Sequence, residues 1–193
     1  MEPTPDRPQM PEAYGIGADG SSAGELLPWS KVEKRLLVSR NYWVCTTRSD
    51  GRPHAKPVWG IWMEGMVVFS TAPESVTGRN LGRDPRLVIH LESGDEAAIL
   101  EGQAQALDDI FFERYADGYD AKYDYRPPST GSPPWSLAPE KVLSWTEADF
   151  PSTATRWKFC WAGTMSRSFG SSTVGRRRTA ASPTSCSTTR SSG

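Results

Sequence analysis

A β-branched and aromatic run at 42–47 and a second strand-forming segment at 53–63 flank the turn signal Asp50-Gly51. An aspartate-glycine pair between two such segments is typical of a β-hairpin. A second turn signal, Glu64-Gly65, separates the second segment from a further apolar run at 66–70. Because hairpins join strands that run in opposite directions, this part of the chain predicts an antiparallel sheet.

A proline interrupts the second of these strands. Pro57 has no backbone N–H and cannot donate a hydrogen bond to a neighbouring strand. The strand is therefore expected to lie at a sheet edge, or beside a gap that a ligand occupies.

The same reasoning extends over the rest of the chain. Apolar alternation and turn residues predict further strands at 87–92, 97–107, 141–145 and 155–159, with helices at 30–39, 75–84 and 110–119. Residues 126–139 contain five prolines and predict a crossing loop without repeating structure. The irregular order of helices and strands favours a mainly β fold, an antiparallel barrel with flanking helices, over a doubly wound parallel sheet.

Composition divides the chain into three parts. Residues 1–25 are rich in Pro, Gly, Ser and acidic residues and predict a disordered N-terminal arm. Residues 26–159 contain the periodic segments and predict one domain of ordinary size. Residues 160–193 are rich in Ser, Thr and Arg, with almost no aliphatic residues, and predict a disordered tail to which we assign no role.

Charge and cysteine content narrow the classes of partner. The formal net charge is −1, but the five arginines of the tail leave residues 1–159 with a net charge of −6. An acidic domain argues against nucleic-acid binding, which needs clustered basic residues.

The three cysteines, Cys45, Cys160 and Cys186, lack the paired spacing of disulfide frameworks or zinc sites. Neither a signal peptide nor a membrane span is predicted, so we expect a cytoplasmic protein.

Hydroxyl-bearing and amide side chains crowd the segment that follows the 66–70 strand. Phosphate binding needs several N–H or O–H donors and a positive charge near a helix N-terminus, and this segment offers all of them. The alternative is that the same residues only cap the following helix. The candidate phosphate ligands are Ser70, Thr71, Ser75, Thr77, Arg79 and Asn80.

No motif indicates a catalytic nucleophile, a metal site or a dinucleotide-binding loop. His54 and His90 have no partner spacing suggestive of metal binding, and we expect neither a metal nor a protein catalytic group. Four of the eight tryptophans, Trp59, Trp62, Trp135 and Trp157, are suited either to stack on a flat ring or to fill the core.

Four segments taken together resemble a known family: Trp43–Trp62, Phe69–Pro85, Ile99–Ala104 and Thr155–Phe159. They resemble the flavin and deazaflavin oxidoreductases of the pyridoxamine 5′-phosphate oxidase-like split-barrel superfamily, most closely the group that uses the deazaflavin coenzyme F-420. The resemblance implies an FMN-binding split β-barrel of six strands with flanking helices. It also implies a homodimer with two cofactor sites at the subunit interface.

The resemblance assigns residues to this site. It implies that Lys56, Pro57, Val58 and Trp59 lie along the ring of the cofactor, and that the hydroxyl-rich segment holds the phosphate end. It implies further that Arg156 and Trp157 lie close to the cofactor. Relatives that bind deazaflavin often carry a lysine where Thr77 stands and a second basic residue where Ser75 stands, so Arg79 is the cation of this loop.

The predicted reaction is hydride transfer between reduced coenzyme F-420 and a small conjugated, electron-poor organic substrate. We expect the substrate near Trp59 and Trp62, beside Lys122 and Tyr123. Because a single phosphate needs fewer cations, an FMN-dependent enzyme of the same fold is the first alternative. The second is a non-catalytic carrier that binds flavin or haem on the same barrel.

Overall fold

The computed structural model describes residues 3–14 and 24–160. The described residues up to Phe159 form one unit. Short turns join β2 to β3 and β3 to β4, and α2 connects β4 to β5. The elements are β1 (Thr4–Asp6), a 3-10 turn (Glu12–Tyr14), α1 (Trp29–Val38), β2 (Asn41–Thr47), β3 (Pro53–Met63), β4 (Met66–Phe69), α2 (Val76–Arg83), β5 (Arg86–His90), β6 (Glu96–Ala106), a 3-10 turn (Asp109–Phe111), α3 (Phe112–Tyr123), β7 (Trp135–Leu137), β8 (Lys141–Thr146), a 3-10 turn (Glu147–Asp149) and β9 (Thr155–Lys158).

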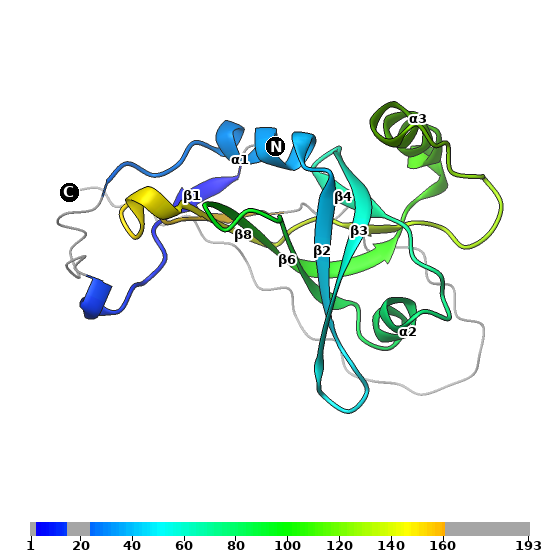
Figure 1. The fold of residues 1–193 in the computed structure, drawn as a ribbon, viewed down its shortest axis with the longest axis horizontal. Coiled ribbons are helices and arrows are strands. Elements are labelled where there is room, and N and C mark those ends of the chain that lie inside the picture. Colours follow the sequence, from blue (N-terminus) through cyan, green and yellow to red (C-terminus); the bar gives the residue numbers. More distant parts are fainter. Residues whose placement is uncertain (1–2, 15–23, 161–193) are drawn as a thin grey trace. The chain divides into compact units, whose positions relative to one another are not determined.

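Six strands close into an antiparallel barrel in the order β6-β5-β2-β3-β4-β7, with β7 returning to pair with β6 (Figure 1). The barrel is split because β6 changes partner along its length. Residues 96–101 pair with β8, whereas 104–106 pair with β7. Gly102 lies at the change, where a Cβ atom would stand 2.8 Å from Leu137 Cδ1. The absence of a side chain at Gly102 therefore lets β7 approach β6. The strand order as a whole confirms the predicted split β-barrel with flanking helices.

Strand β7 lies inside the segment for which the sequence predicted no repeating structure. Residues 135–137 pair with both β4 and β6, and so close the barrel. The prolines on either side of this short strand hid it, because three residues are too few to show a period of two.

Beyond β6 the sheet continues through β8 and β9 to β1. Thr4–Asp6 pair with Arg156–Lys158, and the Asp6 carboxylate accepts two hydrogen bonds from the Arg156 guanidinium, at 2.6 and 2.8 Å. The sequence predicted a disordered arm over residues 1–25, and this part of it is a strand instead. Pairing with a distant strand supplies the hydrogen bonds that local composition does not predict.

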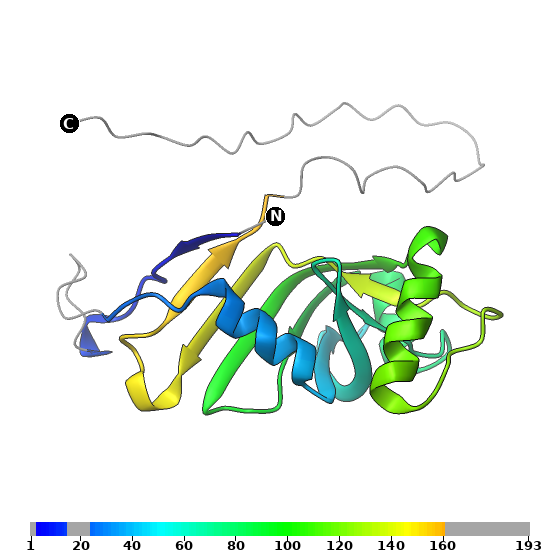
Figure 2. The same cartoon turned by 90° about the horizontal axis from the view of Figure 1, so that it is seen from above.

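The three helices cover different parts of the barrel. Helix α1 packs against β3, α2 against β2, and α3 against β3. In Figure 1, α2 and α3 lie on the same side of the β2–β3 hairpin, and Figure 2 shows α1 running along another face. Helix α3 reaches Tyr123, one turn beyond the predicted end at Tyr119.

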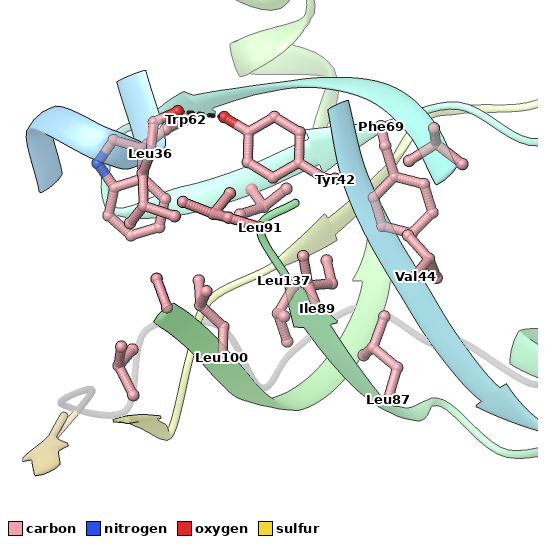
Figure 3. Packing of buried hydrophobic residues seen from close by; sticks show 14 of the residues in the cluster. Leu36, Tyr42, Val44, Trp62, Phe69, Leu87, Ile89, Leu91, Leu100 and Leu137 are labelled. Carbon is pink, nitrogen blue, oxygen red and sulfur yellow. Dashed lines mark hydrogen bonds between the residues drawn. The ribbon is translucent and has the colours of Figure 1, made fainter. Parts of the chain in front are cut away.

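The barrel interior is an apolar cluster, part of which is drawn in Figure 3. Val44, Ile89 and Leu100 are fully buried there, and the Tyr42 hydroxyl donates to the carbonyl of Leu36. A second cluster, which includes Ile61, Met66, Val68, Tyr115 and Tyr119, fixes α3 on the outside of β3 and β4.

The predicted tail, residues 160–193, lies outside the described residues from position 161 onward. Within the described part of the chain, no helix combines the length and the apolar character needed to cross a membrane.

Candidate functional site

Strand β3 has two halves with different neighbours. Residues 53–59 pair with β2 alone, whereas 60–63 pair with β4 alone. Pro57 lies in the first half, where β4 no longer runs alongside and that edge of β3 is open, as the sequence predicted. Lys56 and Pro57 are exposed there, while Val58 is buried. Because Gly60 pairs with Phe69, Ser70 follows opposite Trp59 where the pairing stops. The open edge of β3 and the hydroxyl-rich loop are therefore adjacent.

The loop 70–75 closes over the first turn of α2. Ser75 is the N-cap residue, and its Oγ accepts a hydrogen bond from the Gly78 N–H at 3.0 Å and lies 2.8 Å from Thr71 Oγ1. A Cβ atom on Gly78 would stand 2.3 Å from the Ala72 carbonyl oxygen. Glycine at 78 is thus what permits the loop to fold back on the helix, and Ser75 has the capping role that the sequence left as an alternative.

Two of the predicted phosphate ligands are buried and already hydrogen-bonded. Thr77 and Asn80 are only 1% and 4% exposed. Thr77 Oγ1 lies 3.2 Å from His54 Nε2, and Asn80 donates to Thr46 Oγ1 at 2.9 Å. Burial, followed by the charges of neighbouring Arg48 and Lys56, lowers the pKa of His54. These contacts hold α2 against the β2–β3 hairpin, so Thr77 and Asn80 support the loop from behind.

A basic groove of about 290 Å³ separates the tip of the β2–β3 hairpin from α2. Its single acid, Asp50, is paired with one of its arginines, Arg52, at 2.7 Å. Arg79 donates to the carbonyl of Glu74 and Arg83 to that of Thr47, so both of these hydrogen bonds go to neutral groups. The residues that line this basic groove are Arg48, Ser49, Asp50, Arg52, Val76, Arg79, Asn80 and Arg83.

Trp59 lies at the other end of the open edge and is 41% exposed. Its ring stacks on Tyr123 with centroids 4.7 Å apart, and the Arg40 guanidinium covers it at 5.4 Å. Lys122 Nζ donates to the Gly60 carbonyl at 3.0 Å, and burial lowers the pKa of this amine to about 8. Trp59, Lys122 and Tyr123 are therefore brought together as predicted, although the last two are tied to the backbone of β3.

A larger groove of about 890 Å³ lies between α3, the loop 70–73 and the proline-rich loop 127–134. Tyr115 joins it to the loop 70–75 through a 3.0 Å hydrogen bond between its hydroxyl and Ser70 Oγ. Tyr119, also in its wall, lies 6.4 Å from the Trp59 ring by centroids. This groove, called the aromatic groove below, thus meets the open edge of β3 at Ser70 and Tyr119.

Three predicted site residues lie elsewhere. Trp62 is 7% exposed and packs in the barrel core, where its indole N–H donates to Glu33. Trp157 is 1% exposed and packs against Trp29. Arg156 is paired with Asp6 on β9, which four strands of the sheet separate from β3. The alternation of strands β3 and β9 directs both indoles inward. Because Arg156 also lies far from β3 in the sheet, none of the three side chains reaches the open edge of its own chain.

The sequence reasoning missed Arg48, Arg52 and Arg83. A signal was present, since Arg79 and Arg83 are four residues apart on one helix face and Arg48 and Arg52 flank the hairpin turn. It also missed Tyr115 and Tyr119, which share a face of α3 with Tyr123 at the same spacing.

The site offers shape and charge more than reactive groups. In the residues 3–14 and 24–160, no group of three or more His, Cys, Asp or Glu side chains gathers as a metal would require. A flat ligand with an anionic end matches what is present: an exposed backbone edge, an aromatic cluster at one end and arginines at the other.

The sequence profile of the family described as pyridoxamine 5′-phosphate oxidase matches residues 30–146. This segment contains β2 to β8 and therefore the whole barrel. A search of curated proteins finds no match.

Three solved structures share the fold. A conserved hypothetical protein from Mycobacterium tuberculosis is 20% identical with a TM-score of 0.56, over 63% of this chain and 86% of its own. A candidate 5-nitroimidazole antibiotic resistance protein from Bacteroides thetaiotaomicron is 14% identical with a TM-score of 0.52, over 66% and 83%. A haem-binding protein from Mycobacterium smegmatis is 22% identical with a TM-score of 0.50, over 63% and 55%.

Proposed function

This chain belongs to the pyridoxamine 5′-phosphate oxidase family, and on that premise we propose that it is an oxidoreductase that uses coenzyme F-420. It transfers a hydride between the reduced deazaflavin and a small conjugated organic substrate. The observation that carries this proposal is the open edge of β3 at 53–59, which adjoins both a phosphate-type loop and a basic groove.

The residues present fit such a cofactor. Lys56 to Trp59 expose a length of strand with backbone groups and an aromatic end for a ring system. Ser70, Thr71 and Arg79 would hold the first anionic group, because they are at least partly exposed whereas Thr77 and Asn80 are buried. Asp50 offsets the charge of Arg52, so Arg48 and Arg83 supply the cations that the loop itself lacks.

When bound, the deazaflavin supplies the hydride, so the protein needs no nucleophile. The chain's own contribution is positional. Trp59, fixed by Tyr123 and Arg40, limits where a planar molecule can lie, and the backbone of β3 defines one face of the site. Holding both reactants in register removes the entropy cost of bringing them together.

An FMN-dependent enzyme is the alternative within the family. A single phosphate would be satisfied by Arg79 and two or three hydroxyls. The number of arginines in the basic groove supports a ligand with more than one negative charge, and so favours the deazaflavin. A non-catalytic carrier of flavin or haem is the third candidate, supported by the shared fold of a haem-binding protein. Electron transfer from a reduced cofactor to any acceptor dye separates an enzyme from a carrier.

We propose further that the protein is a cytoplasmic homodimer with each site completed by the partner subunit. Trp59, Leu37 and Val38 are apolar side chains that are 41–71% exposed, on or near β3. Such residues are typical of a surface that another protein covers. Sedimentation equilibrium measures the mass directly, and a monomer at micromolar concentration would contradict this part of the proposal.

The test of function is cofactor binding followed by fluorescence quenching, with FMN and coenzyme F-420 added separately. Arg79→Ala should weaken binding of the preferred cofactor by at least about tenfold, the usual effect of removing one charge-assisted hydrogen bond. Arg114→Ala, which removes an exposed guanidinium that is paired with Glu64 and lines neither groove, is the matched control and should leave cofactor binding unchanged. An unchanged dissociation constant in the Arg79 variant would remove the phosphate assignment.

A further inference from the structure

The aromatic groove meets the proposed cofactor site at two residues that both share. Ser70 and Thr71 form part of its wall, and the same loop borders the open edge of β3. Its volume, about 890 Å³, is within the range of small-molecule sites. A ligand in this groove would therefore lie next to a ring on β3.

The walls of the groove are suited to a flat molecule. Phe112, Tyr119 and Tyr125 contribute aromatic rings, and Tyr125 is 52% exposed. The proline-rich loop 127–134 forms the opposite wall, and prolines restrict the backbone on which they lie. Stacking on rings that are already held in place costs little conformational entropy.

The charge of the groove is negative. Asp109 and Glu113 are its ionisable acids, and among the described residues that line it none is basic. Arg126 lies nearby and is hydrogen-bonded to both Glu113, at 2.8 Å, and Asp117, at 2.6 Å. One guanidinium shared by two carboxylates leaves this group with a net negative charge, to which Asp109 adds.

We propose that the aromatic groove is the substrate site, and that it accepts flat conjugated molecules that are neutral or cationic and excludes anions. This inference rests on the proposed function, because it takes the cofactor to lie along β3. The basic groove on the far side of the loop has the opposite charge. The two grooves therefore sort their ligands electrostatically, the anionic cofactor tail to one and the substrate to the other.

The charge preference of the full-length protein tests the proposal directly. Three tricyclic fluorescent probes of similar size serve as ligands: N-methylacridinium, N-methylacridone and acridone-4-carboxylate. Fluorescence polarisation should show that the cation and the neutral probe bind at least about tenfold more tightly than the anion, from the difference in Coulomb energy. Equal affinities for the three probes would overturn the proposal.

Variants test which residues cause the charge preference among the three probes. The double change Asp109→Asn with Glu113→Gln should abolish it, whereas Asp120→Asn, an exposed acid on the same helix outside the groove, should leave it intact. Tyr125→Ala should weaken all three probes alike by about three- to tenfold, because it removes a stacking surface without changing charge. A preference that survives the double change would place the probes elsewhere and contradict the proposal.

Cofactor binding is measured on the same samples by fluorescence quenching. A protein that sorts the probes but binds neither cofactor would retain the groove as a ligand site and lose the proposed function. A protein that binds a cofactor but does not sort the probes would retain the function and lose this inference.

Discussion

The same residue types have opposite fates in two regions of this molecule. In the open region, which comprises residues 53–59, the loop 70–75, α2 and α3, Trp59 is half-exposed and Arg79 faces solvent. In the closed region, which comprises α1, β8, β9 and β1, Trp157 is buried and Arg156 is paired with Asp6. Residue type alone therefore does not distinguish a ligand contact from a structural one. The direction in which the fold points each side chain, and the partner that it meets there, do.

Replacing the two tryptophans should separate the regions most clearly. Trp157→Ala should destabilise the fold by about 3–5 kcal/mol, the usual cost of removing a large buried aromatic side chain. Trp59→Ala should cost only about 1 kcal/mol, the worth of its stack on Tyr123. Urea unfolding followed by circular dichroism measures both values. Similar losses in the two variants would contradict the distinction.

Two glycines of α2 probe how the open region is held. Gly78→Ala should cost about 1–3 kcal/mol, because the new Cβ meets the backbone of residues 72–73 and the loop must move. Gly82→Ala has no atom within 4 Å of its new Cβ and should stabilise the helix by about 0.5–1 kcal/mol. Thermal unfolding compares the pair. Cofactor binding should weaken in the first variant only, and the assignment of the loop fails if it does not.

Lys122 gives the open region a pH dependence. Burial lowers its pKa from 10.5 to about 8, so between these values the unfolded chain binds more protons and stability should rise with pH. Solvent screening of a half-buried amine limits the change to about 1 kcal/mol. Lys122→Met should remove this rise, and the Tyr123 hydroxyl still provides a donor for the Gly60 carbonyl. Urea midpoints at pH 7.5 and 9 in both proteins test this expectation.

The smallest effect is expected for the ion pair of the closed region. Hydrogen bonding to Arg156 is the main cause that lowers the pKa of Asp6. The pair therefore stabilises the fold above pH 4 or so, and that contribution disappears as acid protonates the carboxylate. Asp6→Asn should cost less than about 1 kcal/mol at pH 7. Cofactor binding should be unchanged, in contrast to Arg79→Ala. Weaker cofactor binding in the Asp6 variant would indicate that Arg156 takes part in the cofactor site.

Much of the barrel could be predicted because its signals are local. The hairpin turn at Asp50-Gly51 and the strand-forming segments on each side depend only on neighbours in the chain, and both strands are found where expected. The open edge followed from Pro57 for the same reason. By contrast, β1 and β7 have three residues each and form only because distant strands pair with them.

The candidate site was partly predictable for a related reason. Ser70 and Thr71 lie in the loop and Arg79 lies on the helix that follows it, and all three are close in sequence to the open edge of β3. Arg48 and Arg83 come from elements that α2 packing brings together, and the pattern of residues carries no measure of that packing. Trp62 and Trp157 are of a residue type suited to stack on a cofactor ring, but strand alternation points their side chains into the core.

By itself, then, the order of residues determined the antiparallel strands, the proline-interrupted edge and the hydroxyl-rich loop, since turn chemistry and backbone donors act over a few residues. Tertiary structure alone decided which strands close the barrel and which donors are consumed internally. It also decided where positive and negative charge collect in separate grooves. Those outcomes depend on contacts between residues far apart in the chain, and such contacts exist only once the barrel has closed.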